Sequence, residues 1–431
     1  MDRFIPNRGA IDFDMAHFNL TRPADDLHPP STEILSPSKE SYRTRLAAGL
    51  VDGSGTGGSR ILAFRSKAPT APAGFENGLA DMYSANAAAT LKTRKAFRAI
   101  PSQPERILDA PDMVDDYYLN LLDWSSSNLV AVALGPTVYA WNAVTGDIQQ
   151  VCETASEGDF VTSVKWASDG KHLAVGTNHA EVQIWDASRS RQVRSLKSHS
   201  ARVSALAWNG HTLSTGGRDS AILHHDVRVR EHLQARLVGH EQEVCGLAWN
   251  AAGTQLASGG NDNLLCVWDA AGATGSVHQP QSPTLRLTAH QAAVKALAWC
   301  PYQSNLLASG GGTADRSIKF WNTHTGACVN SIDTGSQVCS LVWNKHEKEI
   351  LSSHGYAKNQ LCLWKYPSMA KMAELNGHTA RVLHMAASPD GSTVVSAAAD
   401  ETLRFWNVFG EPQGEVKIPT RAAPLRARSI R

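Results

Sequence analysis

The sequence lacks the long apolar runs, the charge imbalance and the leader segment that mark several common classes of protein. No run of about 18 apolar residues occurs, so we expect no membrane-spanning helix. The 41 basic and 40 acidic side chains leave a net charge of +1, which gives no reason to expect a general nucleic-acid or membrane surface. The N-terminus, Met1-Asp2-Arg3, is not followed by the apolar core of a signal peptide. We therefore expect neither nucleic acid nor membrane among the partners.

Cysteine is also sparse, and none of the seven cysteines forms a Cys-x-x-Cys pair. Most of them lie within apolar runs, so we expect reduced core thiols in a protein of the nucleus and cytoplasm. No unrepeated grouping of Ser, His, Asp or Cys has the spacing of a catalytic or metal site. We therefore expect no enzyme activity, no cofactor and no metal.

The first part of the chain, residues 1–101, is rich in Pro, Ser, Gly and Ala and has little periodicity. Residues 52–59 have the composition of a flexible linker. They are not followed by the Gly-Lys-Ser/Thr of a phosphate-binding loop. We predict that residues 1–101 form a disordered tail.

From Tyr117 onward the sequence consists of short apolar runs with regular punctuation. One series of tryptophans has steps of 42, 42, 41, 50 and 44 residues, at positions Trp124, Trp166, Trp208, Trp249, Trp299 and Trp343. A second series ends each unit, in several cases as Trp-Asp, at positions Trp141, Trp185, His225, Trp268, Trp321, Trp364 and Trp406. A repeat of about 40–45 residues with these marks is the signature of a propeller blade, a four-stranded antiparallel sheet. The sequence therefore predicts an all-β fold, a seven-bladed WD-repeat β-propeller over residues 102–410, followed by a basic tail over residues 411–431.

One unit of the repeat places four polar side chains where they would form a buried hydrogen-bonded set: His240, Ser258, Asp262 and Trp268. A His/Asp/Ser grouping is also typical of catalytic triads, but a catalytic site would occur once. This grouping recurs, with the pairs His199/Asp219, His290/Asp315 and His378/Asp400. We interpret it as structural.

Closing the ring requires one strand from outside the array. The two candidates are residues 106–108, before the first blade, and residues 415–418, after the last one. We favour residues 106–108, which would join the start of the ring to its end.

The strongest short motif lies at the start of the chain. Pro6 keeps Ile5 extended, and the apolar pair Phe4 and Ile5 is flanked by the cations Arg3 and Arg8. Such a segment suits a groove with an apolar slot and acidic rims. Residues 2–8 resemble the C-box of the Fizzy family, the co-activators of the anaphase-promoting complex ubiquitin ligase. The resemblance implies that the ligase is docked by Asp2, Arg3, Phe4, Ile5, Pro6 and Arg8.

A second motif, residues 60–69, is an apolar, β-prone island within the tail. Such a segment is suited to adding a strand to the sheet of a partner. It resembles the segment by which the cell-division-cycle subfamily, as found in green plants, binds a mitotic checkpoint protein. The implied contact residues are Arg60, Ile61, Leu62, Phe64 and Pro69.

The third motif is the terminal pair Ile430-Arg431, at the end of a basic stretch. In the family, an Ile-Arg end docks in a tetratricopeptide groove of the ligase. The excess of cations over Glu415 in residues 412–431 would steer the tail toward an acidic site. Without the C-box, a merely solvating tail would explain these residues equally well.

The resemblance extends over the propeller and implies two binding sites for short degrons. The destruction box, Arg-x-x-Leu, is expected between the first and last blades, at Leu108, Asp109, Pro111 and Glu401. There Asp109 and Glu401 would hold the degron arginine. The Lys-Glu-Asn degron is expected on the top face, at Asp116, Tyr117, Asn261, Asn263, Thr313, Gln337 and Arg381. Without the family, these charges and amides would read as ordinary surface and turn residues.

The function implied is recruitment of substrates such as cyclins and securin to the ligase in mitosis. Ser36, followed by Pro37, is a candidate phosphorylation site whose added charge would oppose docking of the C-box. Two alternatives remain: a Fizzy-related sibling, and a plain scaffold propeller. The first differs in checkpoint-protein binding, and the second leaves both tails unexplained.

Overall fold

Short strands and tight turns alternate through the whole described part of the molecule. The computed structural model describes residues 98–410, apart from residues 99, 155, 157, 271–279 and 357, all within the compact unit that begins at Arg98. The 28 elements in these residues are all β-strands. Within the same residues, we find no helix long and apolar enough to cross a membrane.

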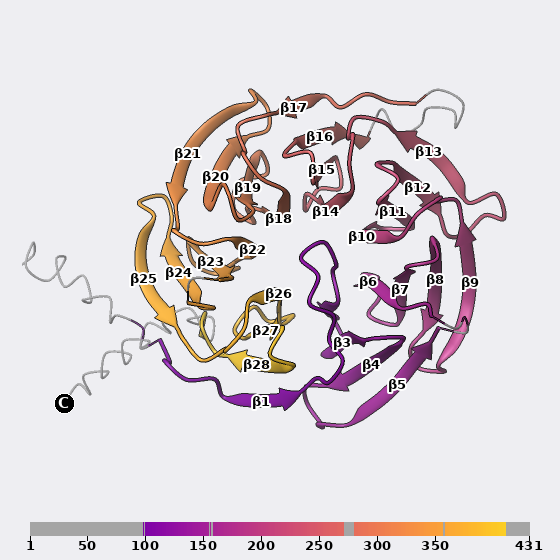
Figure 1. Ribbon diagram of the computed structural model, residues 1–431, viewed down its shortest axis with the longest axis horizontal. Helices are drawn as coiled ribbons and strands as arrows, with labels where there is room; N and C mark the ends of the chain where they lie inside the picture. Colours follow the sequence, from indigo (N-terminus) through magenta and orange to yellow (C-terminus); the bar gives the residue numbers. More distant parts are fainter. Residues whose placement is uncertain are drawn as a thin grey trace, which may run out of the picture. The chain divides into compact units, whose positions relative to one another are not determined.

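The strands form seven sheets of four strands each, which we number as blades along the chain (Figure 1). Blade one contains β2 (Leu122–Trp124), β3 (Leu129–Leu134), β4 (Thr137–Asn142) and β5 (Ile148–Glu153). Blade two contains β6 (Val161–Trp166), β7 (His172–Thr177), β8 (Glu181–Asp186) and β9 (Arg191–Lys197). Blade three contains β10 (Val203–Asn209), β11 (Thr212–Gly217), β12 (Ile222–Asp226) and β13 (Leu233–Leu237).

The remaining blades repeat this order of antiparallel neighbours. Blade four contains β14 (Val244–Trp249), β15 (Gln255–Gly260), β16 (Leu265–Asp269) and β17 (Leu285–Leu287). Blade five contains β18 (Val294–Trp299), β19 (Leu306–Gly311), β20 (Ser317–Asn322) and β21 (Ala327–Asp333). Blade six contains β22 (Val338–Trp343), β23 (Glu349–His354), β24 (Leu361–Lys365) and β25 (Ala370–Leu375). Blade seven contains β26 (Val382–Ala387), β27 (Val394–Ala398), β28 (Thr402–Trp406) and β1 (Arg106–Asp109).

The sheets close into a ring, as the sequence predicts. The first strand of each blade contacts the first strand of the next, and β26 of blade seven contacts β2 of blade one. The strand β1 pairs antiparallel with β28, with Arg106 opposite Phe405 and Asp109 opposite Thr402. The preference for residues 106–108 as the ring-closing strand is therefore confirmed.

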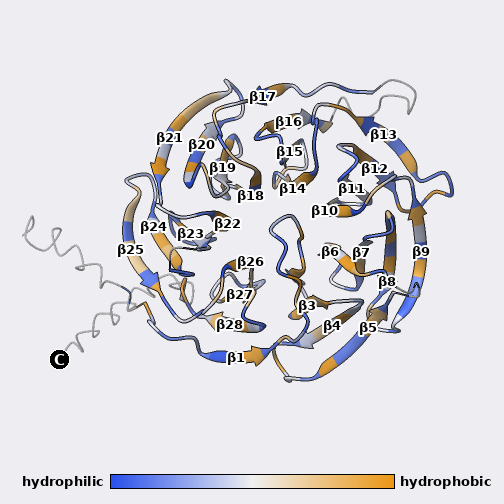
Figure 2. Cartoon of the chain, in the orientation of Figure 1, coloured by the Kyte–Doolittle hydropathy of each residue, from blue (hydrophilic) through white to orange (hydrophobic). Residues whose placement is uncertain are grey.

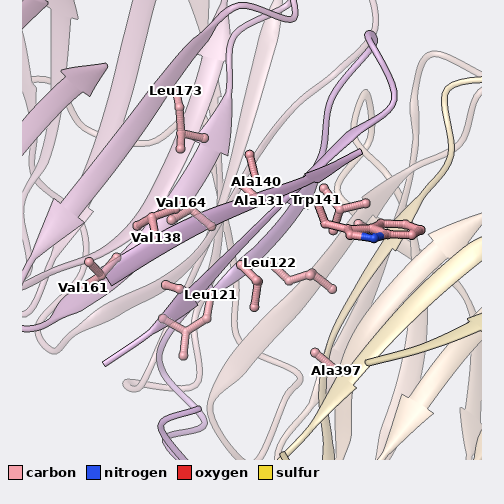
Figure 3. Packing of buried hydrophobic residues seen from close by; sticks show 14 of the residues in the cluster. Leu121, Leu122, Ala131, Val138, Ala140, Trp141, Val161, Val164, Leu173 and Ala397 are labelled. Carbon is pink, nitrogen blue, oxygen red and sulfur yellow. The ribbon is translucent and has the colours of Figure 1, made fainter. Parts of the chain in front are cut away.

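The core lies between neighbouring sheets, where Val, Leu and Ala side chains of the inner strands interlock. Figure 3 shows this packing around blade one, where Trp141 extends toward blade seven and Ala397. Trp141 also lies against Phe405, with ring centroids 4.7 Å apart. The outer strands contain both polar and apolar residues, as the mixed colours of β5, β9 and β21 show (Figure 2). Packing against both neighbours is what lets a sheet of only four short strands bury two faces.

The predicted polar set of blade four forms a continuous hydrogen-bonded chain. Trp268 Nε1 donates to Ser258 Oγ over 2.8 Å, and Ser258 Oγ lies 2.8 Å from His240 Nε2. His240 Nδ1 donates to the carboxylate of Asp262 over 3.0 Å. Burial alone would raise the pKa of Asp262, but the hydrogen bond and charge of His240 hold it below its usual value. The equivalent histidine–aspartate contacts occur at His199–Asp219, His290–Asp315 and His378–Asp400.

Blades three and six build the same network from different residues. In blade three, His225 replaces the tryptophan, and its Nε2 lies 3.1 Å from Thr215 Oγ1. In blade six, His354 comes from the strand itself and lies 2.7 Å from Ser352 Oγ, which also accepts a bond from Trp364. Burial lowers the pKa of His354 to about 4. The recurrence of these networks in five blades supports a structural role.

Candidate functional site

A segment that occurs once in the chain reaches into the middle of the ring. Residues 115–120, which we call the strap, connect β1 to β2 and lie toward the ring centre in Figure 1, before β3. The strap contacts several inner strands at or near their first residues, where the chain enters the blade. Because no other blade has an equivalent of this segment among the residues that the structure describes, its side chains are candidates for function and not for blade structure.

The inner strands have a feature that suits them to hold the strap. In blades two to seven, the inner strand carries an irregularity in register at its second residue, which leaves that residue without an opposite partner in the next strand of its own sheet. The extra residues are Thr162, Ser204, Cys245, Lys295, Cys339 and Leu383. The carbonyl groups of four of them accept hydrogen bonds from the strap or from Lys295, namely those of Thr162, Ser204, Cys245 and Leu383.

Two strap residues bond to main-chain carbonyl groups at the start of the inner strands and so fix the strap across several blades; Asn120 uses two of the extra residues, and Tyr117 uses residues next to them in sequence or one position further. Asn120 donates through Nδ2 to Ser204 O over 2.7 Å and to Cys245 O over 2.9 Å. The buried hydroxyl of Tyr117 donates to Val338 O over 3.2 Å, and it also lies 3.3 Å from Ala293 O. Burial raises the pKa of Tyr117 well above its usual value. These hydrogen bonds therefore hold the strap in a fixed position on the ring.

Acidic side chains of the strap region enclose a single arginine. Arg202 Nη1 donates to Asp116 Oδ2 over 2.8 Å. The same guanidinium makes a two-bond contact with the buried Glu243, over 2.8 and 3.0 Å. Burial opposes the charge of Arg202, yet the two carboxylates raise its pKa above the usual value. Two carboxylates against one guanidinium leave one negative charge in excess, which favours a cationic ligand at this position.

A second arginine lies at the other end of the strap. Arg381 Nε donates to Asp115 Oδ1 over 2.5 Å, and Nη2 donates to the carbonyl of Asp115 over 2.9 Å. Its Nη1 donates to Tyr356 Oη over 3.0 Å, and the guanidinium carbon lies 5.3 Å from the centre of the Tyr356 ring. Gln337 lies beside this arginine across Gly355, and its buried Oε1 has no hydrogen-bond partner among the described residues.

Amide side chains complete the same face. Tyr118 donates through its hydroxyl to Asn261 Oδ1 over 2.7 Å, and Asn261 Nδ2 donates to Gln242 over 2.6 Å. Asn263 follows in the same turn with a φ of 64°, so it also serves the turn itself. Thr313 is exposed in the turn after β19, next to the strap contacts of blade five. Of the seven predicted residues of the top face, Asp116 and Tyr117 belong to the strap, Asn261 and Arg381 bond to it, and Gln337 lies beside Arg381; Asn263 and Thr313 lie in exposed or half-buried turns of blades four and five.

A lysine lies beneath the strap. Lys295 is buried, and its Nζ donates to Leu383 O over 3.1 Å and lies 5.5 Å from the centre of the Tyr117 ring. Burial lowers its pKa to about 8. The ring opening below it forms a cavity of about 350 Å³, lined by inner-strand residues that include Lys295 and His384.

The other predicted site lies at the seam between blades seven and one. Asp109 is exposed at the end of β1, and the next residue, Ala110, donates its amide to Glu401 O over 2.7 Å. Glu401 is exposed in a left-handed turn with a φ of 59°. Leu108 is half-buried against the core, and Pro111 is exposed. The two carboxylates thus share one edge, and within the described residues neither is in an ion pair, an arrangement that suits a guanidinium ligand.

Several predicted residues lie outside the described part of the chain. These are the two tail motifs, residues 2–8 and 60–69, together with Ser36 and the terminal pair Ile430 and Arg431. Within residues 98–410 with the gaps given above, we find no group of three or more His, Cys, Asp or Glu placed to hold a metal.

Sequence reasoning missed several residues around the strap, namely Asp115, Tyr118, Arg202, Glu243, Lys295 and Tyr356. A signal for some of them exists in the repeat itself. Each inner strand from blade two to blade seven starts with valine, whereas the residue before that valine changes its chemistry from blade to blade: Phe160, Arg202, Glu243, Ala293, Gln337 and Arg381. A position that varies from blade to blade beside a constant valine indicates a surface with a role other than packing.

The seven tryptophan-marked sheets and the ring closed by its own first strand define a WD-repeat β-propeller. A family model described as the CDC20/Fizzy WD40 domain matches residues 108–406. The chain therefore belongs to the CDC20/Fizzy family.

Individual relatives agree with this assignment. The chain is 56% identical over 428 residues to an Arabidopsis thaliana protein named cell division cycle 20.1, cofactor of APC complex, covering 98% of this chain and 90% of the relative. It is 51% identical over 440 residues to the anaphase-promoting complex subunit cdc20 of Dictyostelium discoideum, covering 97% and 86%. Arabidopsis thaliana FIZZY-RELATED 3 is 51% identical over 331 residues, covering 77% and 66%.

A solved structure has the same fold. A chain in the crystal structure of a mitotic checkpoint complex matches with a TM-score of 0.68 and 51% identity. The match covers 73% of this chain and 98% of the solved chain. The proteins named above thus include one described as a cofactor of the APC complex, one described as an anaphase-promoting complex subunit, and a chain of a mitotic checkpoint complex.

Proposed function

We propose that this chain is a substrate-recruiting co-activator of the anaphase-promoting complex, acting in mitosis in the nucleus and cytoplasm and without enzyme activity of its own. The observation that carries the proposal is the strap, an unrepeated charged and amide-bearing surface on a ring whose other polar groupings repeat. The names of the relatives support the same role.

The strap surface is proposed to bind the Lys-Glu-Asn degron. The excess carboxylate around Arg202 suits the lysine, and Arg381 suits the glutamate. Amides at Asn261 and Gln337 have the donors and acceptors that an asparagine side chain needs. A shallow surface that contacts only the three side chains of the degron is expected to bind the peptide weakly but specifically.

The seam is proposed to bind the destruction box. Asp109 and Glu401 would hold the arginine, and the half-buried Leu108 offers an apolar neighbour for the leucine. Two degron sites on one rigid ring would let one substrate engage both, which raises its effective concentration.

The tails are proposed to dock the ring on the ligase. Residues 2–8 and the pair Ile430-Arg431 would bind ligase subunits, the latter in a tetratricopeptide groove, and residues 60–69 would bind the checkpoint protein. A degron held on the ring then reaches the ubiquitin-charged enzyme at an effective concentration on the order of mM. Phosphorylation of Ser36 would weaken docking of the basic C-box.

The seam assignment is tested by a double variant, Asp109→Ala with Glu401→Ala. We expect its affinity for a destruction-box peptide to fall about ten- to hundredfold, because two charge-assisted hydrogen bonds to the arginine are lost. Fluorescence anisotropy with labelled peptide measures this. Asp112→Asn, which removes a nearby exposed carboxylate, is the control and should bind normally. Unchanged affinity of the double variant would refute the seam site.

A further inference from the structure

Arg381, the cation proposed to receive a peptide glutamate, is already held by the chain's own residues. Its Nε and Nη2 both donate to Asp115, to the side chain over 2.5 Å and to the main-chain carbonyl over 2.9 Å. Its Nη1 donates to Tyr356 Oη over 3.0 Å. All three nitrogens of the guanidinium are therefore engaged.

Two of the five N–H groups remain, but this arrangement leaves no edge on which both nitrogens are free of the chain's own acceptors. A guanidinium binds a carboxylate best through two parallel N–H groups on one edge. The edge formed by Nε and Nη2 is occupied by Asp115, and the edge formed by Nη1 and Nη2 is blocked at one end by Tyr356. A peptide carboxylate that binds in this way has to displace one of the two.

Asp115 is the partner that is easier to displace. Its side chain is 56% exposed, whereas that of Arg381 is 14% exposed. An ion pair with one partner in water contributes little, since solvent replaces the lost contact. Tyr356, by contrast, contacts Arg381 through its ring as well as its hydroxyl, so it keeps the guanidinium in place when Asp115 leaves.

We propose that Asp115 is an internal competitor that occupies the carboxylate position of the strap, so that a peptide glutamate binds Arg381 by taking the place of Asp115. The inference rests on the proposed Lys-Glu-Asn site and adds two residues to it, Asp115 as competitor and Tyr356 as support. The ligand class is a peptide side-chain carboxylate. Asp115 thereby lowers the affinity for a peptide with a glutamate relative to the same peptide without one.

The test compares two peptides on two variants. Fluorescence anisotropy gives the dissociation constants of a Lys-Glu-Asn peptide and of a Lys-Gln-Asn peptide with the same flanking residues, at one ionic strength. The measured quantity is the preference for glutamate, the ratio of the two constants. We expect Asp115→Asn to raise this preference about two- to fivefold, the range expected when an exposed ion pair competes. Asp112→Asn removes an exposed carboxylate three positions away and should leave the preference as in the wild type.

The ratio of the two dissociation constants separates the competitor role of Asp115 from the proposed Lys-Glu-Asn site. General loss of negative charge weakens both peptides through their common lysine and cancels in the ratio. A wild-type protein that prefers glutamate, combined with an unchanged or smaller preference in Asp115→Asn, would overturn the competitor and leave the proposed site standing. A wild-type protein that binds neither peptide would overturn both. Equal unfolding midpoints of the three proteins establish that the comparison is made on folded chains.

Discussion

The polar networks inside the blades and the charged strap at the centre of the ring both consist of polar side chains. In the blades these side chains satisfy one another, whereas at the strap some remain free to bind a ligand. Inside blade four, His240 and Ser258 are buried, the side chain of Asp262 is 6% exposed, and the three satisfy one another's hydrogen bonds. Around the strap, Asp115 is largely exposed and Gln337 has an oxygen without a partner among the described residues. The first arrangement recurs with the repeat, and the second occurs once.

The comparison teaches that repetition separates structure from function in a propeller. A network that recurs is part of the blade, because each blade faces the same packing problem. A cluster that occurs once is not required by the packing of the blades. Three changes test this division, from the largest expected effect to the smallest.

The largest effect is expected inside the blade. Ser258→Ala removes the hydroxyl between Trp268 and His240 and leaves a buried N–H and a buried ring nitrogen unpaired. We expect the free energy of unfolding to fall by about 3 kcal/mol. Chemical denaturation measures this, and degron-peptide affinity should stay unchanged at temperatures where the variant is folded. Ser258→Thr, which keeps the hydroxyl as Thr215 does in blade three, should cost less; equal losses in both variants would contradict the network's role.

An intermediate effect is expected at the strap, with the opposite pattern. Arg381→Ala removes the proposed partner of the degron glutamate, and we expect affinity for a Lys-Glu-Asn peptide to fall about tenfold or more. Stability should change by less than about 1 kcal/mol, because the partner left behind, Asp115, is 56% exposed and is solvated in the variant. Isothermal titration and denaturation together measure both quantities. Arg286→Ala, which breaks an exposed ion pair with Glu241, is the matched control. If Arg381→Ala loses stability and keeps its affinity for the Lys-Glu-Asn peptide, Arg381 has a structural role and not a binding role.

The smallest effect concerns pH and sharpens the comparison between blades. Burial lowers the pKa of His354 in the folded protein to about 4, below the usual 6.5, and no carboxylate in the described residues contacts its ring. The unfolded chain therefore takes up the proton more readily, so the contribution is complete above pH 6.5 and is lost as the pH falls toward 4. His354→Gln should reduce the loss of stability between pH 7 and pH 5 by about 1–2 kcal/mol. Denaturation at several pH values measures this, and an identical pH dependence in both proteins would count against it.

Much of the fold follows from the sequence because it depends on local patterns. The tryptophan series, the alternating strands and the recurring His/Asp pairs each lie within one repeat, so they predict seven blades and their internal networks. The ring-closing strand was also predictable, because the array needs one strand from outside. Blades three and six show that the network tolerates other residues, such as His225, which the pattern does not foresee.

The site was only partly predictable because its contacts join distant parts of the chain. Arg202 and Asp116 are 86 positions apart, and Arg381 and Asp115 are 266 apart. Such contacts exist only after the ring has closed. The varying residue before each inner-strand valine is the local signal that indicates this surface, and it identifies Arg202 and Glu243 without any contact information.

The central claim, that this ring and its tails link degrons to a ligase, is tested most directly by reconstituted ubiquitination of a destruction-box substrate. The purified ligase is assayed alone, with this protein, and with its Arg3→Ala variant, while peptide binding by the variant is measured in parallel. We predict that the wild type accelerates the reaction strongly and that Arg3→Ala gives no acceleration although it still binds the degron. A ligase that modifies the substrate equally fast with and without the wild-type protein would contradict the account.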